Sequence, residues 1–114
     1  MFKFTKAELA KLTANGAKTA ATGEGNHRPV VKLFNPDGAA TWLLTDIDPE
    51  NHDLAFGLCD LGLGSPELGT VYLPELQNHK GRFGIGIERD LHFTATGPIK
   101  EYADAAREKG SIDA

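Results

Sequence analysis

Residues 46–53, with the sequence DIDPENHD, hold the densest group of potential metal-ligand and acid–base side chains in the chain. Closely spaced carboxylate oxygens are the ligands that hard divalent cations prefer. A calcium-binding loop of this kind requires glycine at its sixth position and glutamate at its twelfth. Counting from Asp46, those positions hold Asn51 and Gly57. We therefore predict a solvated polar loop and no metal site.

Cys59 and Asp60 form a second candidate, because a thiolate can act as a nucleophile beside a general base. An adjacent carboxylate disfavours the thiolate, and the base would have to be His52, His79 or His92. We expect Cys59 to be a buried structural thiol and assign no catalytic residue. A small enzyme or ligand-binding domain that uses Cys59, Asp60 and a histidine stays as the alternative hypothesis.

Residues 62–69, GLGSPELG, form a glycine-rich loop of a kind that can bind phosphate through backbone N–H groups. This loop contains Glu67, lacks Lys and Arg, and precedes an expected strand, so we predict a tight chain reversal and no cofactor. Farther along, Glu88, Asp90 and His92 would share one face of a strand. That spacing allows acid–base catalysis but fits an exposed polar face equally.

The charges are strongly segregated along the chain. Residues 1–32 carry a net charge of +4, residues 33–79 carry −8 and residues 80–114 are neutral. The middle stretch has no Lys or Arg, and its acids are Asp37, Asp46, Asp48, Glu50, Asp53, Asp60, Glu67 and Glu75. Their repulsion must be relieved by solvent, by the basic N-terminal segment or by a cationic partner. The stretch is thus either a solvated acidic face or a docking surface for a basic protein.

Composition sets limits on the class of protein. A chain of 114 residues with 40% hydrophobic and 25% charged residues suits a single globular domain over residues 1–114. No apolar run approaches the roughly 20 residues that span a bilayer, and the N-terminus does not resemble a signal peptide. With one cysteine no internal disulfide can form, which favours a cytoplasmic protein. Direct nucleic-acid binding is disfavoured, since no dense basic stripe with interleaved aromatic residues is present.

Local signals predict the elements that position these groups. Thr5 and Glu8 form a capping box, which starts a helix that we expect to end at Asn15 and Gly16. Small and polar residues 17–29 then read as a connector, which could be mobile. The further pattern predicts strands over 30–34, 40–47, 53–62, 70–73 and 91–96, and helices over 74–80 and 98–110.

This order predicts an α+β domain with a small, mainly antiparallel sheet of four or five strands. An N-terminal, a short middle and a C-terminal helix accompany the sheet, and we expect them on one side of it. Alternation in the strands places Trp42, Leu44, Phe56 and Leu58 in one core. The turns would place Asp37 at one end of the sheet and residues 46–53 at the other.

Most of the chain resembles a known family. The run from VVKLFNPDG to GTVYLPEL, followed by ERDLHFTATGPIKEYADAAR, resembles small bacterial proteins catalogued as a domain of unknown function. The resemblance covers about residues 5–108, and LAFGLCDLGLGSPELG is its most specific string. It implies an accessory protein of plasmids, integrative elements and prophages, often encoded near antirestriction genes. It implies no reaction and no catalytic residue.

We therefore expect a non-enzymatic accessory protein of a mobile genetic element that binds a partner through its acidic surface. A defence component with a basic nucleic-acid groove is one such partner, which makes an antirestriction or anti-CRISPR decoy the specific hypothesis. No metal, cofactor, membrane or direct nucleic acid is expected. The candidate partner-binding residues are Asp46, Asp48, Glu50, Asp53, Asp60 and Glu67.

Overall fold

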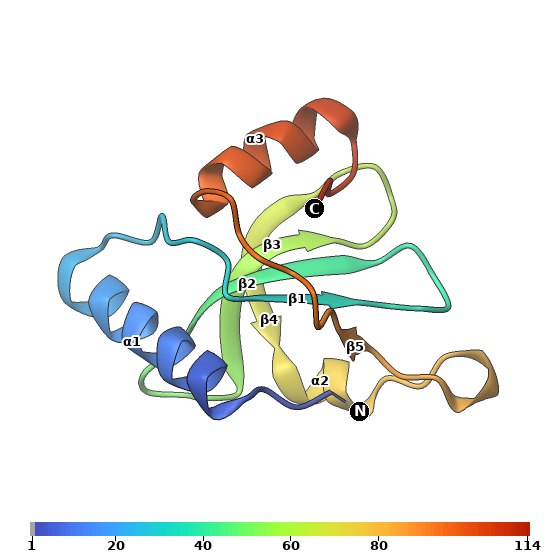
Figure 1. Ribbon diagram of the computed structural model, residues 1–114, viewed down its shortest axis with the longest axis horizontal. Helices are drawn as coiled ribbons and strands as arrows, with labels where there is room; N and C mark the ends of the chain where they lie inside the picture. Colours follow the sequence, from blue (N-terminus) through green and yellow to red (C-terminus); the bar gives the residue numbers. More distant parts are fainter. Residues whose placement is uncertain (1) are drawn as a thin grey trace.

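The computed structural model describes residues 2–114 as an α+β domain built on one antiparallel sheet (Figure 1). The elements in chain order are α1 (Lys6–Thr22), β1 (Val31–Phe34), β2 (Thr41–Ile47), β3 (Leu54–Asp60), β4 (Glu67–Tyr72), α2 (Leu73–Asn78), the 3₁₀ turn η1 (Arg82–Gly84), β5 (Glu88–Arg89) and α3 (Ile99–Lys109). The strands lie in the order β4-β3-β2-β1-β5. The expected fold class is confirmed.

Three successive hairpins, β1–β2, β2–β3 and β3–β4, set the ends of the sheet. Thr41 pairs with Phe34 on β1 and with Asp60 on β3, so the β1–β2 and β3–β4 turns lie at the same end. The β2–β3 turn, residues 48–53, lies at the opposite end beside α1, in the lower left of Figure 1. The acids in and beside these turns are therefore divided between the two ends of the sheet, as the turn positions predict.

The helices cover both faces of the sheet, so the prediction that they share one side is wrong. Leu12 of α1 packs in one buried cluster with Trp42 and Leu44, whereas Leu43 and Leu58 pack with α3 in a second cluster. Figure 1 shows α3 above the sheet and α1 at its lower left. Side chains alternate across a strand, so both faces of the central strands are apolar and each needs a cover. The residues that we expected in one core are therefore divided, with Trp42 and Leu44 in the α1 cluster and Leu58 in the α3 cluster.

Helix α1 begins as predicted and ends later than predicted. The Thr5 hydroxyl accepts the Glu8 N–H at 3.0 Å, and the Glu8 carboxylate accepts the Thr5 N–H at 2.8 Å, which confirms the capping box. The helix continues through Gly16 and ends at Gly23, whose φ of 76° closes it. The expected connector is correspondingly shorter, because residues up to Thr22 are helical. Gly16 serves close packing, since a Cβ there would overlap the carbonyl oxygen of Ile47 on β2.

The strand predicted over residues 91–96 is wrong, and the last strand is the earlier pair Glu88–Arg89. Asp90 ends β5 because its carboxylate accepts the His92 N–H at 2.8 Å, which turns the chain away from the sheet. Phe93, which we expected on a strand, instead lies against Tyr102 of α3, with ring centroids 6.4 Å apart. The alternating pattern of residues 91–96 therefore belongs to a loop in which Phe93 packs against a helix.

Candidate functional site

A β-bulge at the end of β2 sets the geometry of the candidate site. Leu44 pairs with Gly57, but Asp46 pairs with Phe56, so Thr45 is an extra residue on β2. Bulges re-aim the side chains that follow them. Because of this one, Asp46 leaves the face that carries Leu44 and lies beside Phe56, while the side chain of Ile47 returns to the α1 cluster.

Asp46 is a buried carboxylate that keeps one oxygen available. It is 7% exposed, and its Oδ1 accepts the Thr45 hydroxyl at 2.5 Å. Within residues 2–114 no group donates a hydrogen bond to its Oδ2. Every fully buried side-chain polar atom in that range has a partner, so Oδ2, which has none, is not fully buried and keeps contact with solvent. A carboxylate in this position has one acceptor held by the protein and one free for a ligand.

Asp46 opens into a groove of about 550 Å³ between α1 and the β2–β3 hairpin. One wall consists of Gly16, Thr19 and Ala20 on α1 and of Gly25 in the segment that follows the helix. The other wall and the floor are formed by Asp46, Asp48, Pro49, Glu50, Leu54, Ala55, Phe56 and Thr70. The volume lies within the range of about 300–1,000 Å³ that is usual for ligand sites. The groove combines carboxylates with apolar side chains and has no Lys or Arg among its lining residues.

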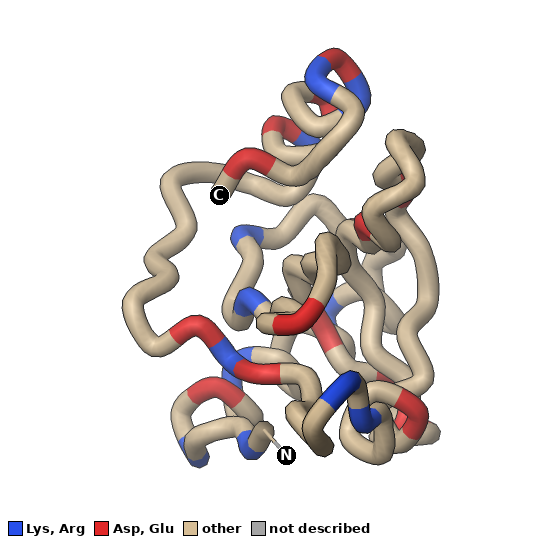
Figure 2. The backbone as a smooth tube through the Cα atoms, turned by 90° about the vertical axis from the view of Figure 1, so that its right-hand side faces the viewer, with Lys and Arg blue, Asp and Glu red and all other residues tan. Residues whose placement is uncertain are grey.

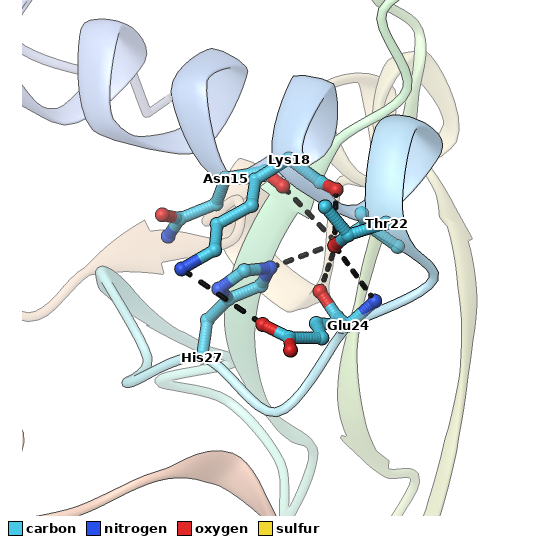
Figure 3. Close-up of polar contacts among 6 residues, drawn as sticks. Asn15, Lys18, Thr22, Glu24 and His27 are labelled. Atoms are coloured by element: carbon cyan, nitrogen blue, oxygen red, sulfur yellow. Dashed lines mark hydrogen bonds and ion pairs between the residues drawn. The ribbon is translucent and has the colours of Figure 1, made fainter.

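Polar contacts hold the α1 wall of the groove in place (Figure 3). The Thr19 hydroxyl lies 3.0 Å from the carbonyl oxygens of Asn15 and Glu24 and 2.8 Å from Nε2 of His27. The Asn15 side chain donates to the carbonyl oxygen of Thr45 at 2.9 Å. Lys18 and Glu24 form an exposed ion pair at 4.0 Å. These contacts tie the end of α1 to the following segment and to the bulge.

The structure gathers some of the sequence-predicted acids and separates others. Asp46, Asp48 and Glu50 line the groove, and Asp53 is exposed on the same hairpin but does not line it. Asp60 is at the opposite end, 3% exposed, and accepts the N–H groups of Gly62 and Ile112 at 2.8 and 3.0 Å. It fixes the C-terminal segment and presents no charge at the surface.

Glu67 also lies away from the groove, at the beginning of β4. It is exposed and lines a separate hollow with Pro66, Leu68 and Arg107 of α3. The six predicted partner-binding residues thus divide into one cluster on the β2–β3 hairpin and two isolated positions at the other end of the sheet.

The hairpin acids have no internal counter-charge. Within residues 2–114, every ion pair uses an acid from outside residues 33–79: Glu8, Glu24, Asp90, Asp104 and Asp113. Asp48 accepts the Glu50 N–H at 2.8 Å, which shapes the turn without neutralising either carboxylate. The negative charge of the hairpin is therefore available to an external cation.

Cys59 lies in a different groove, of about 420 Å³, together with Trp42, Glu75 and His79. Burial raises the pKa of the Cys59 thiol to about 11, which keeps it protonated at neutral pH. Asp60, the next residue on the strand, has both oxygens engaged by backbone N–H groups. Cys59 is therefore a protonated thiol at neutral pH, and His79 is the candidate histidine that lies in the same groove.

Two further findings concern the described part of the chain. Within residues 2–114 no group of three His, Cys, Asp or Glu side chains is placed to hold a metal ion. No helix in the same range has the length and apolar character needed to cross a membrane.

Sequence reasoning did not identify Phe56 and Thr45 as parts of the site. Strict alternation assigned Phe56 to a core with Trp42, whereas it is half-buried and lines the groove. One signal was present, because an isolated glycine within a strand often marks a bulge. Gly57 is that residue, and a Cβ there would overlap the carbonyl oxygen of Leu43.

Comparison with known proteins supports a family assignment without a function. No curated protein and no solved structure shows significant similarity to the chain. One family model, described as "Protein of unknown function (DUF2958)", matches residues 4–113. That match covers nearly all of the 114 residues, including both walls of the groove. The chain therefore belongs to the DUF2958 family.

Proposed function

We propose that the protein acts without catalysis, by binding a basic surface of a partner protein through an acidic hairpin made of Asp48, Glu50 and Asp53 with Asp46 behind them. The observation that carries this proposal is the absence of ion pairs to these acids within residues 2–114. Residues two apart lie no more than about 7 Å apart at Cα. This is within the Debye length of about 8 Å at physiological salt, so their fields add.

The contrast with α3 supports the choice of surface. Basic and acidic residues occur in equal number along α3, where both colours occur in Figure 2, and Asp104 lies 4.0 Å from Arg107. Such a helix has little net field to attract a charged partner. The hairpin offers one sign only, which favours rapid association with a cationic surface.

A carboxylate surface can occupy a groove that is built to bind phosphates. We therefore propose a nucleic-acid-binding defence component as the partner class, so that the protein acts as an antirestriction or anti-CRISPR decoy. The family resemblance, with its setting on plasmids and prophages, supports this biological context. Binding itself requires only that the partner protein have a basic surface.

A matched pair of triple variants tests the proposal. Asp48→Asn, Glu50→Gln and Asp53→Asn remove three charges from the hairpin while each amide keeps an oxygen acceptor. The control removes three charges from exposed residues elsewhere that form no ion pair within residues 2–114: Glu67→Gln, Glu88→Gln and Glu108→Gln. A fluorescent nona-lysine peptide serves as the basic probe, and anisotropy gives the Kd at low and physiological salt.

The hairpin variant should bind the probe roughly 3- to 150-fold more weakly, since three exposed ion pairs are worth about 0.2–1 kcal/mol each. The control should bind almost as the parent protein does. Equal losses in the two variants would show a diffuse charge effect and would refute docking at the hairpin. Binding that is unaffected by salt would refute the electrostatic basis.

A further inference from the structure

The groove beside the acidic hairpin has the chemistry of a receptor for one long cationic side chain. We propose that it receives a single arginine side chain of the partner, with its guanidinium at Asp46 and its stem along the apolar wall. This inference rests on the proposed function and goes beyond it, because it specifies a residue of the partner and a site that general charge attraction does not require.

Asp46 provides the anchor. It is 7% exposed, its Oδ1 is held by the Thr45 hydroxyl, and within residues 2–114 its Oδ2 has neither a recorded hydrogen-bond donor nor an ion pair. A carboxylate that is mostly removed from water gains more from a charged donor than an exposed one does. Asp48 lies two residues along the chain in the lining of the same groove and adds a second carboxylate.

The apolar part of the groove decides between kinds of cation. Phe56, Leu54 and Ala20 line it, so an occupant must offer hydrocarbon as well as positive charge. A small hydrated ion cannot use such walls, and within residues 2–114 no three side chains are grouped to ligate a metal. Arginine and lysine side chains have an apolar stem and a charged head, which matches this arrangement.

Two features favour arginine over lysine. A planar guanidinium has five N–H donors and can bridge carboxylates of two residues, here Asp46 and Asp48, whereas an ammonium is a compact point charge. The guanidinium also stacks on aromatic faces and is more weakly hydrated, so it loses less on entering a groove beside Phe56. The α1 wall is already held by the contacts of the Thr19 hydroxyl with Asn15, Glu24 and His27, so little ordering is left for binding.

The test compares three short peptides that differ at one position. Acetyl-Gly-Gly-X-Gly-Gly-amide is prepared with arginine, lysine or citrulline as X, and each peptide is titrated into the isotope-labelled full chain. The arginine peptide should shift the amide signals of Gly25, Ala55 and Thr70, which belong to both walls and the floor of the groove. Lysine should bind about two- to fivefold more weakly, and citrulline, which has the same shape without the charge, should not bind measurably.

Variants then locate the peptide. Asp46→Asn keeps the oxygen that accepts from Thr45 and should weaken arginine binding by about ten- to a hundredfold, the usual range for a lost charged hydrogen bond. Ala20→Leu adds bulk at an exposed helix position on the groove wall and should block the arginine peptide without changing any charge. Asp53→Asn, on the same hairpin but outside the groove, should leave the arginine preference intact.

The outcomes separate this inference from the proposed function. If nona-lysine binds the hairpin acids but the arginine peptide shifts no groove signal, or if Ala20→Leu binds it normally, the arginine site is refuted and the docking surface stands. If the arginine peptide enters the groove but the hairpin triple variant binds nona-lysine normally, the docking proposal fails and the arginine site stands. Loss of both signals refutes both.

Discussion

Replacing Gly16 by alanine tests how closely α1 approaches the sheet. In an exposed helix this change stabilises by about 0.8–1.0 kcal/mol, because glycine loses more backbone freedom on folding. At Gly16 the added Cβ would overlap the carbonyl oxygen of Ile47, which belongs to the backbone of β2 and cannot rotate away. The helix must therefore move away from the strand.

The magnitude follows from the contacts that such a movement disturbs. Overpacking of a well-packed interior costs about 1–3 kcal/mol. The hydrogen bond from the Asn15 side chain to the Thr45 carbonyl, 2.9 Å long, lies beside the overlap, and its loss adds about 0.5–1.5 kcal/mol. After the helix propensity gain is subtracted, we expect Gly16→Ala to lower the free energy of unfolding by roughly 0.5–3.7 kcal/mol.

Urea unfolding provides the measurement. The single tryptophan, Trp42, is 6% exposed and reports the core by fluorescence, while circular dichroism reports the helices. Gly69→Ala on β4 is the matched control, because no atom lies within 4 Å of a Cβ at that position. It should change the stability little. A Gly16→Ala protein as stable as the parent, or more so, would refute the close approach of α1 to β2.

Three other measurements address the remaining contacts. Thr5→Ala should lower the free energy of unfolding by about 0.5–2 kcal/mol, and Glu8→Ala by more, because Glu8 also accepts Arg89 at 3.1 Å; equal losses would contradict that second role. Iodoacetamide should modify Cys59 slowly at neutral pH and rapidly in urea, since burial raises the pKa of its thiol to about 11; fast native modification would contradict the burial. The hydrogen bond from the His92 N–H, followed by the charge of Lys32, lowers the pKa of Asp90 below its ordinary value of 3.8, so the stability it provides is present above that pH and is lost on further acidification. Stability of Asp90→Asn should therefore approach that of the parent protein as the pH falls, and a constant difference would contradict the shift.

Features that depend on a few neighbouring residues could be predicted from the sequence. The Thr5–Glu8 capping box and the turn that places Asp37 between β1 and β2 are confirmed, because each is formed by contacts within one turn of chain. Features that depend on packing between elements distant in the sequence could not be predicted in this way. Asn15 and Gly16 have the local chemistry of a helix end, yet the helix continues because β2 provides contacts that the local pattern does not contain.

The same difference between local and distant contacts explains which parts of the candidate site could be predicted from the sequence. The acidic character of residues 46–53 and its separation from Asp37 follow from the order of the turns, and the structure agrees with that division. The groove itself was not predictable, because it requires the end of α1 to lie beside the β2–β3 hairpin. Asp60 shows the opposite case, since its carboxylate looks like part of the acidic surface but is used to fix Ile112 of the C-terminal segment.

The bulge at Thr45 links the fold to the proposed site. Without the extra residue, Asp46 would follow Leu44 onto the α1 face, where it would bury a carboxylate among apolar side chains at considerable cost. With it, Ile47 occupies that face and Asp46 lies next to Phe56 in the groove. Gly57 permits this arrangement by letting the backbone of Leu43 come close. The packing of α1 and the position of the groove carboxylate therefore depend on the same irregularity, so a change that removes the bulge should destabilise the core and abolish the site together.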